Sequence, residues 1–178
     1  MTVLISLFVG LVALVVLIVL IGFALPERSD GRFVARLASS PEEVWEALQD
    51  VDAHPMTGKS KRSLEHLPEE AAGPHWREDM GHGEIIDVRT LALERPRRLV
   101  RTMASQASNM TSEWEYRLDP LDGGTRLEVS GATHIRRGTW HMPIFRVMMR
   151  VGGGVRAGMR IQARMLAASL GVELETVA

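Results

Sequence analysis

The first part of the chain is one uninterrupted apolar segment. Residues 2–25 carry no charged side chain, and the apolar run is interrupted only by Thr2, Ser6, Gly10 and Gly22. As an α-helix, residues 3–25 would extend roughly 35 Å, which exceeds a hydrocarbon core of about 30 Å. Pro26 and a polar stretch up to Arg32 then end the segment. This pattern predicts a transmembrane anchor over residues 1–26, followed by a soluble domain over residues 27–178.

Two alternatives to a retained anchor are a cleaved signal peptide and a buried helix of a soluble domain. A signal peptide has a basic start and a shorter apolar region of roughly 7–15 residues, whereas this segment has no Lys or Arg and ends in Phe23-Ala24-Leu25, a poor cleavage site. A helix that is apolar all round rarely begins a soluble domain. Three arginines follow the segment and no basic side chain precedes it. The positive-inside tendency therefore predicts a single-pass membrane protein whose soluble domain is cytoplasmic.

The pattern changes after residue 26 from one apolar run to short alternating segments. Residues 26–31 are expected to be a linker, and Gly31–Ala38 alternates as a strand does. Ser39 or Ser40 can cap a helix over Pro41–Gln49. Six strand-length runs separated by turn residues follow, and successive strands joined by short turns predict an antiparallel meander. The runs are 61–67, 75–80, 83–94, 98–104, 110–118 and 125–135.

The last segment, residues 142–174, has helical periodicity, with apolar side chains at spacings of three, four and seven. Gly152-Gly153-Gly154 interrupts it, and three glycines cost roughly 2–3 kcal/mol relative to alanine inside a helix. Two arrangements are open: one helix kinked at the glycines, or a short helix followed by a longer one. The glycines could shape or gate a pocket, or simply be a tolerated kink.

Composition narrows the possible functions. The chain has 21 Lys and Arg against 22 Asp and Glu, so it lacks the basic surplus of nucleic-acid binders. The absence of cysteine excludes disulfides, thiolate nucleophiles and zinc sites built on sulfur. The six histidines have no spacing typical of a metal site. We therefore predict no metal, no cofactor and no assigned catalytic residue, with one alternative: His54, His134 or His141 as a general base at a cavity mouth.

Three stretches carry a resemblance to a known superfamily. They are Ala38-Ser-Ser-Pro-Glu-Glu-Val-Trp45, the hairpin sequence from Glu113 to Leu127, and Pro143-Ile-Phe145. Together with the element order they resemble the START-like, or SRPBCC, superfamily, which includes Bet v 1-like and polyketide cyclase/dehydrase-type proteins. The resemblance covers about residues 31–172 and implies an α+β helix-grip fold. In that fold a curved antiparallel sheet wraps around a long C-terminal helix, with a cavity between them.

The alternation of strand residues indicates which side chains would face that cavity. Met110, Ser112, Trp114, Tyr116 and Leu118 share one face, while Glu113 and Arg117 lie on the other, which should be solvated. Each pocket candidate could instead be ordinary core. The predicted pocket residues are Trp76, Met80, Trp114, Tyr116, Val129, Met148 and Met159.

Seven arginines lie in or near the C-terminal helical segment. They could form a solvated helix face or contact anionic lipid headgroups. They are Arg136, Arg137, Arg146, Arg150, Arg156, Arg160 and Arg164.

These features predict a membrane-anchored domain that binds a hydrophobic small molecule or lipid without catalysing a reaction. One alternative is an enzyme similar to polyketide cyclases and dehydratases, and another is a module that binds a protein partner without a small ligand. A roomy apolar cavity would favour the first function. A roomy cavity with an inward His or Glu would favour the enzyme, and a cavity filled by its own side chains would favour the partner module.

Overall fold

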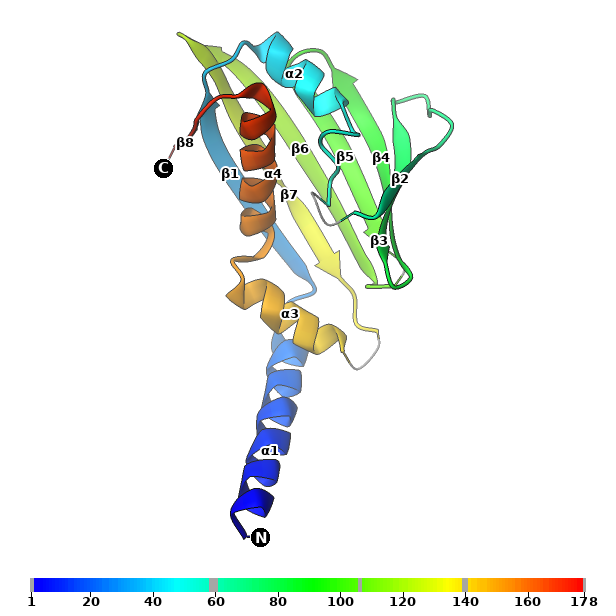
Figure 1. Ribbon diagram of the computed structural model, residues 1–178, viewed down its shortest axis with the longest axis vertical. Coiled ribbons are helices and arrows are strands. Elements are labelled where there is room, and N and C mark those ends of the chain that lie inside the picture. Colours follow the sequence, from blue (N-terminus) through cyan, green and yellow to red (C-terminus); the bar gives the residue numbers. More distant parts are fainter. Residues whose placement is uncertain (1, 58–60, 106, 139–140, 178) are drawn as a thin grey trace.

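The computed structural model describes residues 2–57, 61–105, 107–138 and 141–177. A long helix projects from one end of a sheet-and-helix domain (Figure 1). The helices are α1 (Thr2–Ala24), α2 (Pro41–Gln49), α3 (Met142–Val151) and α4 (Gly154–Leu170). The strands are β1 (Arg28–Leu37), β2 (Ser63–His66), β3 (His75–Gly81), β4 (Glu84–Glu94), β5 (Arg98–Ser105), β6 (Met110–Leu121), β7 (Gly124–Ile135) and β8 (Leu174–Thr176).

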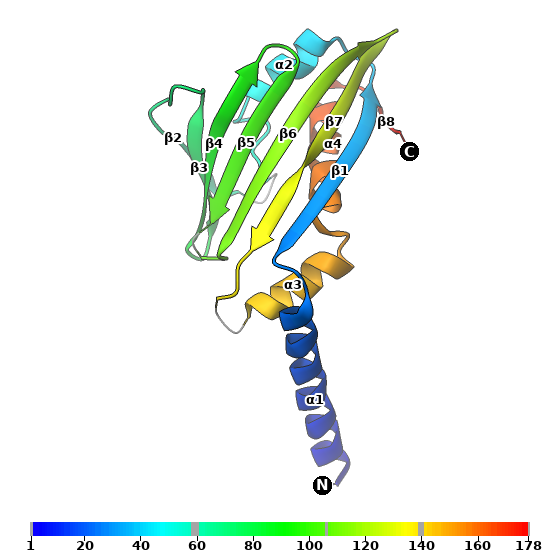
Figure 2. The ribbon, with the colours of Figure 1, turned by 180° about the vertical axis from the view of Figure 1, so that it is seen from behind.

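The eight strands form one antiparallel sheet in the order β2-β3-β4-β5-β6-β7-β1-β8. Helix α4 packs against one face of this sheet, and the other face points away from it (Figures 1 and 2). The alternation on β6 and β7 is as predicted. Trp114, Tyr116 and Leu118 are buried beneath the helices, whereas Glu113 and Arg117 are exposed. The predicted α+β helix-grip fold is therefore confirmed.

The N-terminal cap of α2 is Ser40. Its side chain accepts a hydrogen bond from the Glu43 backbone N–H, and the Glu43 carboxylate accepts one from the Ser40 backbone N–H. This reciprocal pair is a capping box, which satisfies two amide groups that the first helical turn would leave unpaired. Val44, Trp45 and Leu48 of α2 then pack into the core.

Three predictions about element boundaries need correction. The stretch 26–31 is not a linker up to Gly31, because β1 begins at Arg28, which pairs with His134 on β7. The helix predicted to reach residue 174 ends at Leu170, because Gly171 is left-handed at φ 66°. The chain then adds β8 to the free edge of β1, a strand that the helical pattern did not predict.

The triple glycine separates two helices, the second of the two arrangements left open by the sequence. Gly153 and Gly154 have φ values of 88° and 61°, in the left-handed backbone region that strains residues other than glycine. Helix α3 consequently turns away from α4 and crosses the end of α1 (Figures 1 and 2).

Candidate functional site

The described residues line a small cavity beneath α4, with a volume of about 10 Å³, close to the space needed for one water molecule. It lies between α2, the segment after α2, the middle of the sheet and α4. Its lining residues are Leu48, His54, Met56, Arg101, Tyr116, Leu127, Gln162, Ala163 and Leu166.

Arg101 places a cation in this interior. Its side chain comes from β5, is 1% exposed, and lies 4.9 Å from the centre of the Trp76 ring. One terminal nitrogen donates to the Leu48 carbonyl at 3.0 Å, whereas Nε has no acceptor among the described residues. Burial lowers the pKa of the guanidinium to about 10. At neutral pH the group is therefore charged, buried and incompletely hydrogen-bonded.

Glu78 on β3 is a buried carboxylate whose charge acts on Arg101. Its hydrogen bonds, however, are made with other groups. It accepts from the backbone N–H groups of Met56 and Thr57 at 2.6 and 2.8 Å, and from Trp76 Nε1 at 2.8 Å. The Thr57 hydroxyl donates to it as well. Glu78 thus holds the chain after α2 against the sheet; it interacts with Arg101 through its charge, but Arg101 forms no ion pair with a carboxylate of the described residues.

The segment Asp50–Thr57 covers the cavity. From α4, Gln162 Nε2 donates to the carbonyls of Pro55 and Met56 at 3.0 and 2.6 Å. His54 is 6% exposed, and its Nδ1 has no partner among the described residues. Burial lowers the pKa of His54, partly opposed by Asp50, so the ring is neutral at pH 7.

A groove of about 660 Å³ lies on the outer side of the same segment, between it and α4. Its lining includes Pro55, Ile161, Met165 and Ala168, and it shares His54 with the internal cavity. The segment Asp50–Thr57 is therefore the wall that separates the groove from the interior.

The predicted pocket residues fall into three groups. Tyr116 lines the cavity; its hydroxyl contacts the Met56 sulfur at 3.6 Å, and burial raises its pKa. Trp76, Trp114, Val129 and Met159 lie in the surrounding core, with Met80 packed at its edge. Met148 lies elsewhere, on α3, and is 64% exposed. A ligand role for these seven residues remains a prediction.

Two buried charged residues were absent from the predicted set, although the sequence held a signal for both: Arg101, which lines the cavity, and Glu78, which accepts a hydrogen bond from the lining residue Met56. Arg101 occupies the inward position between Leu99 and Met103 on β5, and Glu78 lies between Trp76 and Met80 on β3. In each strand the signal is the same: a charged residue stands at a position that the alternation assigns to the inward face.

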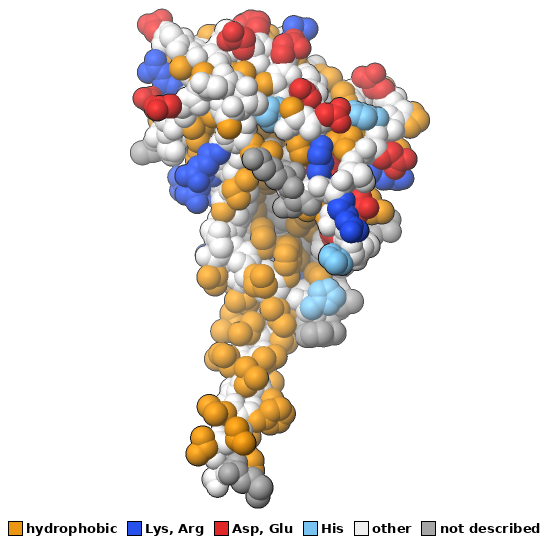
Figure 3. Space-filling view, in the orientation of Figure 1, with side chains coloured by type: hydrophobic (Ala, Val, Ile, Leu, Met, Phe, Trp, Pro, Cys, Tyr) orange, Lys and Arg blue, Asp and Glu red, His pale blue; other side chains and the backbone are white. Residues whose placement is uncertain are grey.

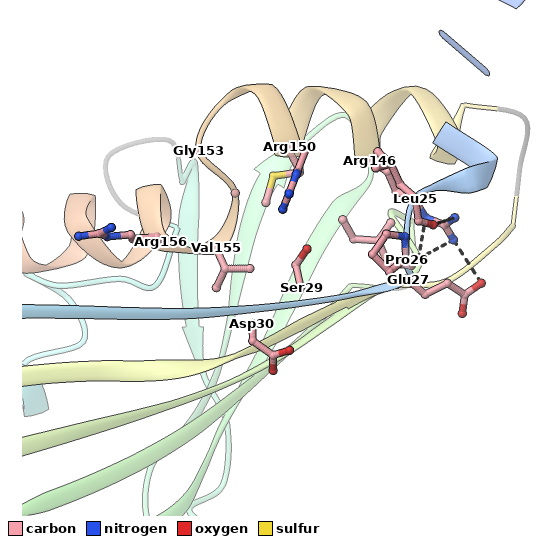
Figure 4. Close-up of a pocket in the computed structure, with 13 residues that line it drawn as sticks. Leu25, Pro26, Glu27, Ser29, Asp30, Arg146, Arg150, Gly153, Val155 and Arg156 are labelled. Carbon is pink, nitrogen blue, oxygen red and sulfur yellow. Dashed lines mark hydrogen bonds and ion pairs between the residues drawn. The ribbon is translucent and has the colours of Figure 1, made fainter. Parts of the chain in front are cut away.

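A second pocket lies where α1, β1, α3 and α4 meet, and we call it the junction pocket (Figure 4). It has a volume of about 270 Å³ and includes Leu25, Pro26, Ser29, Arg150 and Arg156 in its lining. Figure 4 shows Arg150 reaching from α3 toward Ser29 on β1.

Arg146 forms one wall of the junction pocket and joins α3 to the end of α1. Its side chain is 3% exposed and donates to the Ile135 carbonyl at 2.8 and 3.1 Å. It also donates to the carbonyls of Gly22 and Leu25 at 3.3 and 3.4 Å, and pairs with Glu27 at 3.2 Å. Because the last carbonyls of a helix lack partners within the helix, this arginine caps α1.

Helix α1 is long and apolar enough to cross a bilayer, a property that it shares with signal sequences. The apolar window of α1 is not buried inside the protein. Hydrophobic side chains cover α1, whereas the charged side chains lie on the domain (Figure 3). Across the described ranges, no three His, Asp or Glu side chains are grouped so that they could hold a metal ion.

Comparison with known proteins gives a match in structure but none in sequence. No protein-family model matches the chain, and no curated protein matches it significantly. Norcoclaurine synthase from Thalictrum flavum is similar in structure, with a TM-score of 0.59 and 9% identity over 80% of this chain and 93% of that one.

Two further structures agree. Mll3558 from Rhizobium loti has a TM-score of 0.55 and 21% identity, covering 79% of this chain and 96% of its own. Ara h 8.0201 has a TM-score of 0.54 and 13% identity, covering 79% and 99%. The chain has a Bet v 1-like fold. At these identities the likeness concerns the fold, and the activity must be argued from the site.

Proposed function

We propose that this protein is a membrane-anchored START-like domain that binds a hydrophobic small molecule or lipid between the sheet and α4. Helix α1 is the anchor, and the soluble domain lies on the cytoplasmic side, where Arg28, Arg32 and Arg36 follow the anchor. The ligand carries a hydrogen-bond acceptor, such as a carboxylate, at the end that reaches Arg101.

The observation that carries this proposal is the buried Nε of Arg101, which borders the cavity beneath α4 and has no acceptor among the described residues. Leaving a buried donor without an acceptor costs about 1–3 kcal/mol, and more when the group is charged. His54 Nδ1, also without a partner among the described residues, borders the same cavity. A ligand carboxylate beside Arg101 would supply the missing acceptor and compensate the buried charge.

Uptake requires the cavity to enlarge, since about 10 Å³ cannot hold a lipid. The wall between cavity and groove is the segment Asp50–Thr57, which is held to α4 by two hydrogen bonds from one side chain, Gln162. Outward movement of this segment would join the groove of about 660 Å³ to the interior. Methionines at Met56 and Met165 suit such a change, because their side chains adapt to variable contents.

The small volume of the cavity favours a second candidate function, a module that binds a protein partner and no small ligand. In that case Arg101 would be a structural cation, and the interior would stay closed. The enzyme alternative has less support, because His54 is the one histidine among the described residues that line the cavity.

Cross-linking with a photoreactive fatty acid separates these candidates. The full chain in lipid nanodiscs is illuminated with a diazirine palmitic acid, and the modified peptides are mapped by mass spectrometry. Ligand binding predicts adducts on β5, β6 and α4, lost in Arg101→Met and retained in Arg97→Gln, an exposed control. The methyl ester of the same probe should label these strands more weakly. Adducts confined to α1 would refute ligand binding in the interior and support the partner module.

A further inference from the structure

Helix α3 presents apolar side chains to the outside at the point where α1 leaves the domain. Val151 is 83% exposed and Met148 is 64% exposed. Exposed apolar groups of this size at the exit of a membrane helix need an apolar environment to cover them. We infer that α3 and the junction pocket form a binding surface for an anionic bilayer, with Met148 and Val151 among the acyl chains and Arg150 and Arg156 on lipid phosphates. This inference rests on the proposed anchoring by α1.

The position of α3 along α1 places it at the membrane surface. A Cβ at Gly22 would lie 2.1 Å from the Pro143 carbonyl oxygen, so the two backbones touch near the last turn of α1. A 23-residue helix extends about 35 Å, slightly more than the hydrocarbon core, so its last turn lies at the headgroup boundary. Helix α3 crosses α1 there, so the part of α3 around Pro143 lies at the same depth (Figure 1).

The attachment of α3 to α1 fixes this arrangement. Arg146 bonds the carbonyls of Gly22 and Leu25 on one side and the Ile135 carbonyl of β7 on the other. The anchor is therefore joined to the domain by packing and hydrogen bonds, and α3 keeps one orientation relative to it. A helix held in this way presents a defined set of side chains to the bilayer.

Charge in this part of the chain is complementary to an anionic surface. Residues 129–172 contain seven arginines and no Asp or Glu, although the whole chain has a net charge of −1. Arg150 and Arg156 are exposed and form no ion pair within the described ranges. Each basic residue near an anionic membrane contributes about 1 kcal/mol. An amphipathic helix with arginine beside apolar side chains is the pattern typical of interfacial binding.

The two carboxylates of the junction pocket do not cancel this charge. Asp30 pairs with Arg28 at 2.8 Å, and Glu27 pairs with Arg146 at 3.2 Å and Arg137 at 3.4 Å. Arg150 points toward Ser29 (Figure 4), and the lining of the same pocket includes Leu25 and Val155, so a headgroup there would meet both a cation and an apolar wall.

Depth-dependent quenching tests the apolar part of the surface. The chain has no cysteine, so a single fluorescent label can be placed at Val151→Cys in the full chain, reconstituted in phosphatidylglycerol vesicles with doxyl-labelled lipids. The matched control is Leu121→Cys, which is exposed and at the opposite end of the sheet. A third label, Leu14→Cys, reports α1 itself. We expect quenching at positions 14 and 151 and none at 121.

Lipid selectivity tests the arginines. Native mass spectrometry of the full chain from mixed phosphatidylglycerol and phosphatidylcholine nanodiscs gives the ratio of bound lipids. We expect Arg150→Gln and Arg156→Gln each to lower the phosphatidylglycerol enrichment by about fivefold, and Arg97→Gln, another exposed arginine, to leave it unchanged.

The results distinguish a failure of the inference about α3 from a failure of the proposed anchoring by α1. Quenching at position 14 without quenching at 151 would overturn the inference about α3 and leave the anchor intact. An unquenched label at position 14 would overturn the anchoring and this inference together. Equal enrichment in Arg150→Gln, Arg156→Gln and Arg97→Gln would overturn the role of the arginines.

Discussion

Replacing Arg101 by methionine should make the unliganded protein more stable while it weakens ligand uptake. Methionine fills much of the same volume, has no charge and needs no hydrogen bond. If Arg101 served only stability, its replacement would lower the stability of the unliganded protein. A gain in stability together with weaker ligand uptake therefore identifies Arg101 as a binding group.

The size of the stability effect follows from the environment of the guanidinium. Burial lowers its pKa from the ordinary value to about 10, and at about 1.4 kcal/mol for each pKa unit the charged form costs roughly 3 kcal/mol in the folded state. The variant loses the hydrogen bond to Leu48, about 1 kcal/mol, and the contact with the Trp76 ring, about 1 kcal/mol. The net expectation is a stabilisation of about 1 kcal/mol, which raises Tm by roughly 2–4 °C.

Thermal unfolding of the full chain in detergent micelles, followed by tryptophan fluorescence, measures this difference. The stability difference between the variant and the wild type also depends on pH. Above about pH 10 the unfolded state binds more protons at Arg101 than the folded state, because burial has lowered the pKa of the folded state, so wild-type stability gains from rising pH. The advantage of the variant should therefore shrink at pH 11. A variant that melts several degrees below wild type at pH 7 would show that Arg101 is a counter-ion required by buried Glu78, and would refute the reasoning.

Three further perturbations test other parts of the structure. Gly22→Leu should separate α1 from α3, because a Cβ at this position would collide with the Pro143 carbonyl. We expect faster hydrogen exchange in α3. In the control Gly10→Leu, where a Cβ would have no neighbour within 4 Å, exchange in α3 should match that of the wild type. His54 has a lowered pKa, so the unfolded state binds more protons and stability should fall as pH drops below about 6.5. His54→Gln should flatten that part of the Tm profile, and an unchanged slope would assign it to other groups. Gln162→Leu removes two hydrogen bonds to the covering segment; exchange at residues 50–57 should rise. Unchanged protection would mean that the bonds with Glu78, Lys61 and His66 are enough to hold the segment.

Most of the fold was predictable because its signals are local. Alternation on β6 and β7 assigned Trp114, Tyr116 and Leu127 to the buried face, where they lie. Ser40 marked the start of α2, and three glycines marked the break between α3 and α4. The element boundaries that were wrong depend on pairing over long distances. Residues Arg28–Asp30 look like a linker until β7 supplies their partners, and the chain after Gly171 becomes a strand because β1 has a free edge.

The sequence by itself determined the apolar helix, the meander of strands and the clustering of arginines near the C-terminus, because each is visible in neighbouring residues. The tertiary structure alone decided that Arg101 and Glu78 are both buried yet not paired with each other, since that depends on how β3, β5 and the segment after α2 are brought together. It also decided that Met148, predicted for an internal pocket, lies outside beside the end of α1. The physical reason is the same in both cases: periodicity assigns a side chain to a face, whereas burial and partners depend on which distant element covers that face.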